Sequence, residues 1–336
     1  MTRTLLTRSL SVRTSTQRGF TLLEIVVSMA LMALISVVLA STLGPWMKLK
    51  QKIDTDHKLS DLQSSLTLLY SANAMTAEDS SGAAVSLAAG GQIVSSSIGG
   101  DRRCQNSAAT WQAMAPYLAE GPTTARLDGG SNEFCIFVSP QLQTQQSGVT
   151  LYYHNIAIVS TGVRGMLDPG TGMDPSTGAL SLGGDNAGVM VSGLSIQVAK
   201  LASTQNKLDT LATLYGTYFT TQYLANSARD ISIDYFAAAN PTGLWDSASG
   251  SVQGTAGQEN YSAFSALSVL GVTAQDTQTD YETNTTIYLA NYNECPAGQC
   301  VRSNWNGGSA PFTAILYAPV PGPGGNFAMK VVSGNY

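Results

Sequence analysis

The chain has 336 residues, of which 43% are apolar and only 12% are charged, about half the share that is usual in globular proteins. Lys and Arg number 17 against 22 Asp and Glu, and this net charge of −5 argues against a nucleic-acid-binding protein. The two histidines, His57 and His154, lie far apart in the sequence, which excludes a His-rich metal site. Neutral polar residues and glycine replace the missing charges, a composition typical of an exported protein rich in strands.

The N-terminal segment changes character abruptly at Phe20. Residues 1–19 contain four arginines and no acidic residue, whereas the run from Phe20 to Leu43 is apolar with one charged residue, Glu24. A helix of that length extends about 36 Å, enough to cross a hydrocarbon core of about 30 Å. The arginines predict a cytoplasmic N-terminal side, with the rest of the chain outside the inner membrane. A carboxylate inside such a run costs up to about 3 kcal/mol, so we expect Glu24 to have a partner.

The order of residues around this change resembles a known signature. Arg18, Gly19, Phe20 and Glu24, followed by the apolar helix, resemble the class III leader of type IV pilins and type II secretion pseudopilins. The resemblance implies that a prepilin peptidase removes residues 1–19 by cutting after Gly19 and then methylates Phe20. It also implies that Glu24 pairs with the N-terminal amine of a neighbouring subunit during assembly.

The same resemblance implies partners and a location. The partners are other pilin subunits, the prepilin peptidase and an inner-membrane assembly platform. Before assembly the protein is expected to cross the inner membrane once, with its globular part in the periplasm. After assembly it is expected in a cell-surface pilus or a periplasmic pseudopilus.

The helix is predicted to continue past the apolar run, over residues 20–78. We predict a bend or local melting at Gly44-Pro45, because proline removes a helical hydrogen bond. Beyond it, apolar residues recur every three or four positions, which predicts an amphipathic helix whose stripe packs on a sheet. The members of this stripe are Trp46, Leu49, Ile53, Leu59, Leu62, Leu66, Leu69 and Tyr70.

Two regions follow, and both mix helices with antiparallel strands. The first, 79–200, is a pilin-like globular α+β region that opens with loops and short elements, including a short helix at Trp111–Ala119. Its strand patterns are Glu133–Ser139, Val149–Tyr153, Asn155–Ser160 and Val189–Ala199. The second, 201–336, begins with an amphipathic segment at Thr204–Asn226. It continues with Ile231–Ala237, a short helix at Tyr261–Leu270, and strands at Thr285–Tyr292, Phe312–Val320 and Phe327–Val332.

The expected fold class is therefore α+β. A long N-terminal helix, half membrane-spanning and half amphipathic, packs on an antiparallel sheet, and an elaborated C-terminal α+β lobe follows.

The four cysteines allow three pairings, and proximity in the sequence favours Cys104 with Cys135 and Cys295 with Cys300. An oxidising periplasm suits both bridges. A redox or metal site at Cys295 and Cys300 is the alternative, but the spacing is wrong for the usual C-x2-C. Acidic residues in the Gly-rich loops, Asp168, Asp174 and Asp185, are calcium ligands or turn residues, and their spacing favours turns.

The function expected from these features is structural. No nucleophile, P-loop or metalloprotease motif is present, so we expect no enzyme, no cofactor and no metal. The mature chain is larger than a main fibre subunit, which favours a minor pilin of a type IV pilus or related secretion fibre. The alternatives are a pilus-tip adhesin whose C-terminal lobe binds a host or surface ligand, and a pseudopilin of a type II secretion system.

Overall fold

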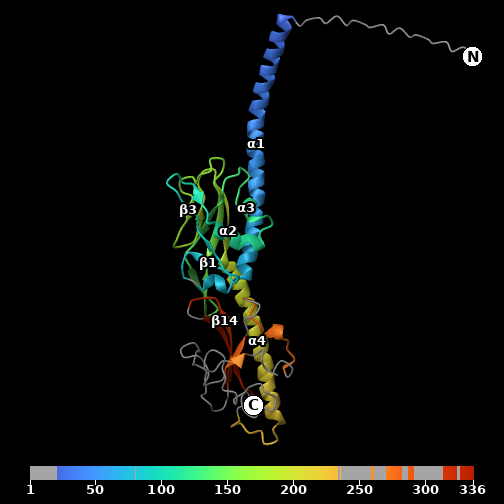
Figure 1. Ribbon diagram of the computed structural model, residues 1–336. Coiled ribbons are helices and arrows are strands. Elements are labelled where there is room, and N and C mark those ends of the chain that lie inside the picture. Colours follow the sequence, from blue (N-terminus) through green and yellow to red (C-terminus); the bar gives the residue numbers. More distant parts are fainter. Residues whose placement is uncertain are drawn as a thin grey trace, which may run out of the picture. The chain divides into compact units, whose positions relative to one another are not determined.

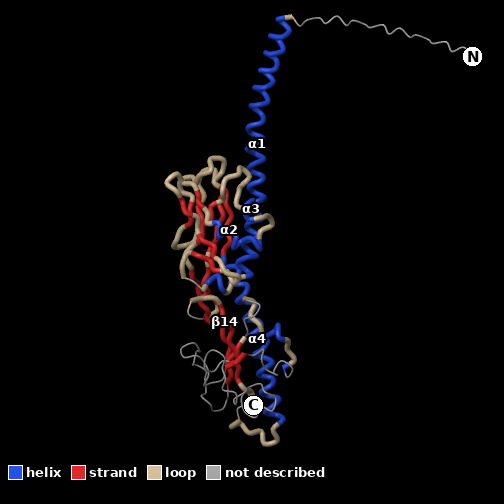
Figure 2. The backbone as a smooth tube through the Cα atoms, viewed as in Figure 1, coloured by secondary structure: helices blue, strands red, loops and turns tan. Residues whose placement is uncertain are grey.

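The computed structural model describes residues 21–79, 81–233, 235, 259–260, 270–281, 287–290, 313–323 and 326–336. Contacts along the chain divide it into two units, Met1–Lys50 and Gln51–Tyr336. The described part of the first unit is helical, and the second unit holds all the sheets (Figures 1 and 2). The predicted α+β class is confirmed.

Helix α1 covers Leu22–Ala72, which is 51 residues, and Pro45 lies inside it. The predicted melting at Gly44-Pro45 is wrong, because the helical conformation continues on both sides of the proline. A stretch of helix with the length and hydropathy of a bilayer span is not found among the described residues. The span predicted over Phe20–Leu43 is thus not confirmed.

Only the C-terminal part of the apolar stripe of α1 is buried in the core. Leu59, Leu62, Leu66, Leu69 and Tyr70 are buried. The earlier members of the stripe are exposed: Trp46, Leu49 and Ile53. The globular part first covers the helix near Thr55, whose hydroxyl accepts a hydrogen bond from the Gly129 amide at 3.0 Å. The sequence pattern is continuous, but its packing partner begins only there.

The buried part of α1 packs on a three-stranded antiparallel sheet of order β11-β8-β5. Its strands are β5 (Cys135–Val138), β8 (Asn155–Ser160) and β11 (Ala187–Ser192). The central strand β8 is buried along its whole length, because α1 covers one face and a second apolar cluster around Phe137, Ala157, Val159 and Leu167 covers the other. The predicted strands Glu133–Ser139 and Asn155–Ser160 are confirmed.

Short elements complete this first lobe, defined here as residues 51–192. They are η1 (Thr76–Glu78), β1 (Ala84–Ser86), β2 (Gln92–Val94), β3 (Ser97–Ile98), β4 (Cys104–Gln105), α2 (Ala108–Met114), η2 (Ala115–Tyr117), α3 (Pro122–Ala125), β6 (Leu142–Gln146), β7 (Val149–Tyr153), β9 (Gly172–Met173) and β10 (Leu180–Ser181). Strands β1 and β2, β3 and β4, β6 and β7, and β9 and β10 form two-stranded antiparallel pairs. The helix predicted at Trp111–Ala119 corresponds to α2 and η2, and the strand predicted at Val149–Tyr153 is β7.

The second lobe, residues 193–336, places helix α4 (Gly193–Ala225) against a four-stranded antiparallel sheet (Figure 1). The strand order is β12-β13-β14-β15. The strands are β12 (Glu259–Asn260), β13 (Tyr288–Ala290), β14 (Thr313–Val320) and β15 (Asn326–Ser333), and η4 covers Ala274–Thr277. Leu201, Leu208, Leu211, Tyr215 and Phe219 form the buried face of α4.

The predictions that concern this lobe and its start meet different outcomes. The strands at Phe312–Val320 and Phe327–Val332 are confirmed as β14 and β15. The strand pattern predicted at Val189–Ala199 is wrong after Ser192, where α4 begins, because Leu194, Val198 and Leu201 have helical spacing and pack in the second core. The start of the segment Ile231–Ala237 is a turn, and most of the helix predicted at Tyr261–Leu270 falls outside the described residues.

Two leucines of α1 offer a test of this packing. Leu66 is fully buried, so Leu66→Ala should lower the free energy of unfolding by about 2–5 kcal/mol through lost burial and a cavity. Leu68 is 64% exposed, and Leu68→Ala should change it by less than about 0.5 kcal/mol. Denaturant unfolding of the purified chain, followed by circular dichroism, measures both, and equal losses would contradict the assignment of the buried face.

Candidate functional site

The predicted processing residues, Gly19 and Phe20, fall outside the described residues, whereas Glu24 lies in the first turn of α1. Its Oε2 accepts hydrogen bonds from the Thr21 amide at 3.1 Å and the Thr21 hydroxyl at 3.2 Å. The Glu24 amide donates in turn to the Thr21 hydroxyl oxygen at 3.4 Å. This reciprocal capping box satisfies the amides of Thr21 and Glu24, two of the free amides at the start of the helix. Within a single chain, Glu24 is therefore a helix-capping residue.

Apolar side chains surround α1 after this cap. The large apolar residues from Leu22 to Val37 are exposed, and they do not form one stripe. They are Leu22, Leu23, Ile25, Val26, Val27, Met29, Leu31, Met32, Leu34, Ile35 and Val37. A helix that is apolar all round is normally buried in a membrane or in an assembly. This surface therefore requires a covering that a single chain does not supply within the described residues.

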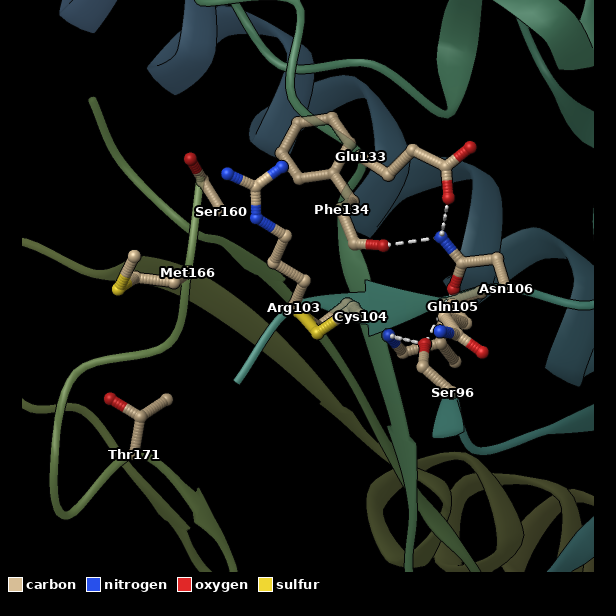
Figure 3. Close-up of a disulfide and its surroundings, with 12 residues drawn as sticks. Ser96, Arg103, Cys104, Gln105, Asn106, Glu133, Phe134, Ser160, Met166 and Thr171 are labelled. Carbon is tan, nitrogen blue, oxygen red and sulfur yellow. Dashed lines mark hydrogen bonds between the residues drawn. A yellow bond between two sulfur atoms is a disulfide. The ribbon is translucent and has the colours of Figure 1, made fainter. Parts of the chain in front are cut away.

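The structure brings together one of the two predicted cysteine pairs. Cys104 on β4 and Cys135 on β5 form a disulfide with Cα atoms 5.4 Å apart. The other pair, Cys295 and Cys300, lies outside the part of the chain that the structure describes. The bridge fastens the segment 95–106 beside β5, and Asn106 adds hydrogen bonds to the Phe134 carbonyl at 2.6 Å and Glu133 Oε2 at 3.3 Å (Figure 3).

The fastened segment covers the outer edge of β5. The amide of Ile136 donates to the Ser96 hydroxyl at 2.7 Å, and its carbonyl accepts from the Ser96 amide at 2.8 Å. The amide of Val138 donates to the Ser95 hydroxyl at 2.9 Å, and its carbonyl accepts from the same hydroxyl at 3.3 Å. Two serine hydroxyls and one backbone amide thus satisfy edge groups of β5 that would otherwise need another strand.

A buried polar cluster that the sequence analysis did not find lies where α1 ends. Tyr70, Glu78 and His154 are fully buried, and we call them the Tyr70–Glu78–His154 cluster. Nδ1 of His154 lies 2.8 Å from Glu78 Oε2, and the Tyr70 hydroxyl donates to Glu78 Oε1. Gln141 adds hydrogen bonds to the Glu78 carbonyl at 2.8 Å and to Oε2 at 3.2 Å. The signal in the sequence was a Glu six residues after a long helix and a His directly before a strand with an apolar centre.

A polar groove of about 660 Å³ lies between α4 and β15 in the second lobe. Hydroxyl side chains from α4 and from β15 line it, and Asp209 and Lys330 form an ion pair of 2.6 Å at its wall. The hydroxyl residues are Thr213, Thr217, Thr220, Thr221 and Ser333. The groove therefore offers hydroxyl groups to a ligand. The two charged residues in its wall pair with each other.

The acidic residues in the Gly-rich loops have local roles. Oδ1 of Asp174 accepts from the Ser176 amide at 2.7 Å and hydroxyl at 2.6 Å, and these hydrogen bonds lower the pKa of its carboxyl. Asp168 accepts from the Asp185 amide at 2.8 Å and contacts Arg164 at 3.4 Å. Asp174 thus forms the turn that its sequence predicts. No cluster of three or more metal-binding side chains occurs among the residues that the structure describes.

Comparison with known proteins gives a match at the N-terminus. Residues 14–40 match the family model of the prokaryotic N-terminal methylation motif, which is the signature of type IV pilins and pseudopilins. No curated protein and no solved structure matches the chain. The predicted resemblance to this class is confirmed over these residues, which include Gly19, Phe20 and Glu24.

The disulfide should contribute measurably to stability, because it closes a loop of 31 residues. Replacing both Cys104 and Cys135 with alanine should lower the free energy of unfolding by about 3–4 kcal/mol on the chain-entropy model. Each single substitution should cost nearly as much as the double one, since either breaks the same bond. Denaturant unfolding without reductant measures all three variants, and additive losses would contradict the pairing.

Proposed function

We propose that this chain is a minor pilin, a structural subunit of a type IV pilus or a related secretion fibre. The observation that carries the proposal is a methylation motif at residues 14–40 that leads directly into a helix with exposed apolar side chains on all sides. Cleavage after Gly19 would make Phe20 the methylated N-terminus. The same motif supports a structural, non-enzymatic role, with a prepilin peptidase and other pilin subunits as partners.

Under this proposal, lipid covers the exposed helix before assembly and other helices cover it afterwards. Before assembly, the bilayer of the inner membrane covers it, and the globular part lies in the periplasm. After assembly, the helices of neighbouring subunits replace the lipid, and small residues such as Ala30 and Ala33 allow close approach. The fibre is then a surface pilus or a periplasmic pseudopilus, and an inner-membrane platform drives the transfer.

Glu24 supplies the polar part of this assembly. Cleavage exposes a protonated α-amine at Phe20, and a carboxylate of a neighbouring subunit is its natural partner in an apolar surrounding. Both contacts with Thr21 use Oε2 of Glu24, and a carboxylate accepts about four hydrogen bonds. A neighbour's amine can therefore bind Oε1 while the helix cap is kept. This pairing would set the stagger between adjacent helices.

The two roles of Glu24, capping and pairing, can be separated by substitution. Glutamine keeps the capping box but carries no charge, so Glu24→Gln should strongly reduce incorporation into fibres while leader removal stays normal. Immunoblots of sheared fibres measure incorporation, and the intact mass of membrane-extracted protein measures processing. Glu24→Ala is the matched control that loses both roles. If Gln supports normal incorporation and Ala does not, capping is the role and the pairing proposal fails. A wild-type mass that includes residues 1–19 would contradict the pilin function itself.

A second candidate function is adhesion, in which the second lobe binds a ligand at a fibre tip. The groove between α4 and β15 favours it, because hydroxyls and a compensated ion pair suit a neutral, hydroxyl-rich ligand such as a carbohydrate. This candidate adds to the pilin proposal and depends on it for display at the surface.

Two threonines on the exposed side of α4 test this adhesion candidate. Thr217 lines the groove, whereas Thr210 is exposed outside it, and both hydroxyls donate to the carbonyl four residues earlier. Thr217→Trp should fill the groove and reduce binding of fibres to cells or a glycan array at least tenfold, while Thr210→Trp should not. Fibre number, counted by electron microscopy, should be unchanged in both. Equal binding by the two variants would contradict a site in the groove.

A further inference from the structure

The Tyr70–Glu78–His154 cluster lies at the point where the two lobes meet. Tyr70 belongs to α1, Glu78 ends η1, and His154 lies between β7 and β8. All three side chains are shielded from solvent, and none has a role in the fibre proposal. A buried ion pair costs desolvation energy, so its presence calls for a reason other than stability alone.

Both ring nitrogens of His154 lie beside oxygen acceptors. Nδ1 is 2.8 Å from a carboxylate oxygen of Glu78, and Nε2 is 2.8 Å from the carbonyl oxygen of Gly82. A neutral imidazole carries a hydrogen on one nitrogen only. With that hydrogen on Nε2 for the Gly82 carbonyl, a neutral ring would leave Nδ1 unprotonated beside the Glu78 carboxylate, a contact whose geometry is that of an ion pair and not of a hydrogen bond. The geometry therefore fits the doubly protonated, positively charged ring.

The backbone of His154 ties this ring to the second lobe. Its amide donates to Glu78 Oε1 at 3.1 Å, and its carbonyl accepts from the amide of Gly193, the first residue of α4, at 2.9 Å. Gly193 packs so closely on the Tyr70 hydroxyl that a Cβ atom there would overlap it. One turn further, the side chain of Gln197 donates to the Ala74 carbonyl at 3.0 Å. The start of α4 is thus bound to the end of α1 through the cluster.

We propose that the Tyr70–Glu78–His154 cluster is a pH-sensitive clasp between the lobes, closed when His154 is protonated and loosened when the ring loses its proton. Proton loss removes the positive charge that lies 2.8 Å from the Glu78 carboxylate. The Glu78 carboxylate then remains buried without its cation, and the contacts that hold the first turn of α4 weaken.

The direction of the pH effect follows from the protonated ring. Burial by itself lowers the pKa of His154, but the charge and hydrogen bonding of Glu78 and the Gly82 carbonyl outweigh it, so the pKa is raised above its ordinary value of about 6.5. The stabilisation is fully present below that ordinary value and is lost as pH rises through the higher pKa of the folded protein.

The other groups that face His154 do not titrate in this range or carry no charge. Burial, together with the charge of Glu78, raises the pKa of Tyr70 well above 10, so its hydroxyl stays protonated. Gln141 and Gln197, which reach the cluster from the loop before β6 and from α4, are neutral amides. Within the described residues, Glu78 is thus the charged partner that responds to the state of the ring.

The two histidines of the chain provide a matched pair of variants. The unfolding equilibrium constant of the full-length wild-type protein in detergent should rise between pH 6.5 and pH 9, tenfold for each unit by which folding raises the pKa. His57 is exposed on α1, so His57→Gln should keep this slope. His154→Gln should remove it. A slope that survives in His154→Gln, or disappears in His57→Gln, would overturn the proposal.

A measurement on the wild-type protein covers the case in which His154→Gln fails to fold. Nitrogen-15 NMR of the His154 ring, assigned by comparison with His57→Gln, should show its midpoint of protonation at a pH above the ordinary value of about 6.5. Over the same pH rise, the amide protection factors of Gly193 and Gln197, corrected for intrinsic exchange, should fall by more than those of Ile158 in the centre of β8. A His154 ring whose midpoint of protonation lies at or below about pH 6.5, or an even fall in protection, would contradict the clasp.

Discussion

The burial of one face of α1 against the β11-β8-β5 sheet is the interaction on which the first lobe depends. Leu59, Leu62, Leu66 and Leu69 form a ridge that enters the core, where Ile156 and Ile158 of the central strand belong to the same apolar cluster. The same helix exposes apolar side chains over its N-terminal part, where no sheet covers it. One helix thus packs into a folded lobe along one part and presents exposed apolar side chains along another.

Much of this arrangement could be predicted because it depends on local patterns. The strands β7 and β8 match their predicted bounds, since short apolar runs between turn residues determine both. Proximity in sequence was enough for Cys104 and Cys135. The exposure of Trp46 and Ile53 could not be predicted, because periodicity shows that a face is apolar but not where its packing partner begins.

The Tyr70–Glu78–His154 cluster and the start of α4 could not be predicted for a different reason. Glu78 and His154 are 76 positions apart, and each alone has an ordinary explanation as a helix-end acid and a strand-edge histidine. The start of α4 was not predicted because Val191, Ile196 and Val198 are residues that favour strands locally. Packing against the apolar core of the second lobe stabilises a helix there instead. Long-range contacts override local preference at these positions.

The serine contacts along β5 bear on aggregation, which is a risk for chains that gather at high density in one plane. Unpaired strand edges are templates on which copies of a protein stack into insoluble ribbons. With Ser95 and Ser96 occupying the outward amides and carbonyls of Ile136 and Val138, this template is blocked within each molecule. The bridge from Cys104 holds the blocking segment in place, so oxidation during maturation would also protect against self-association of the wrong kind.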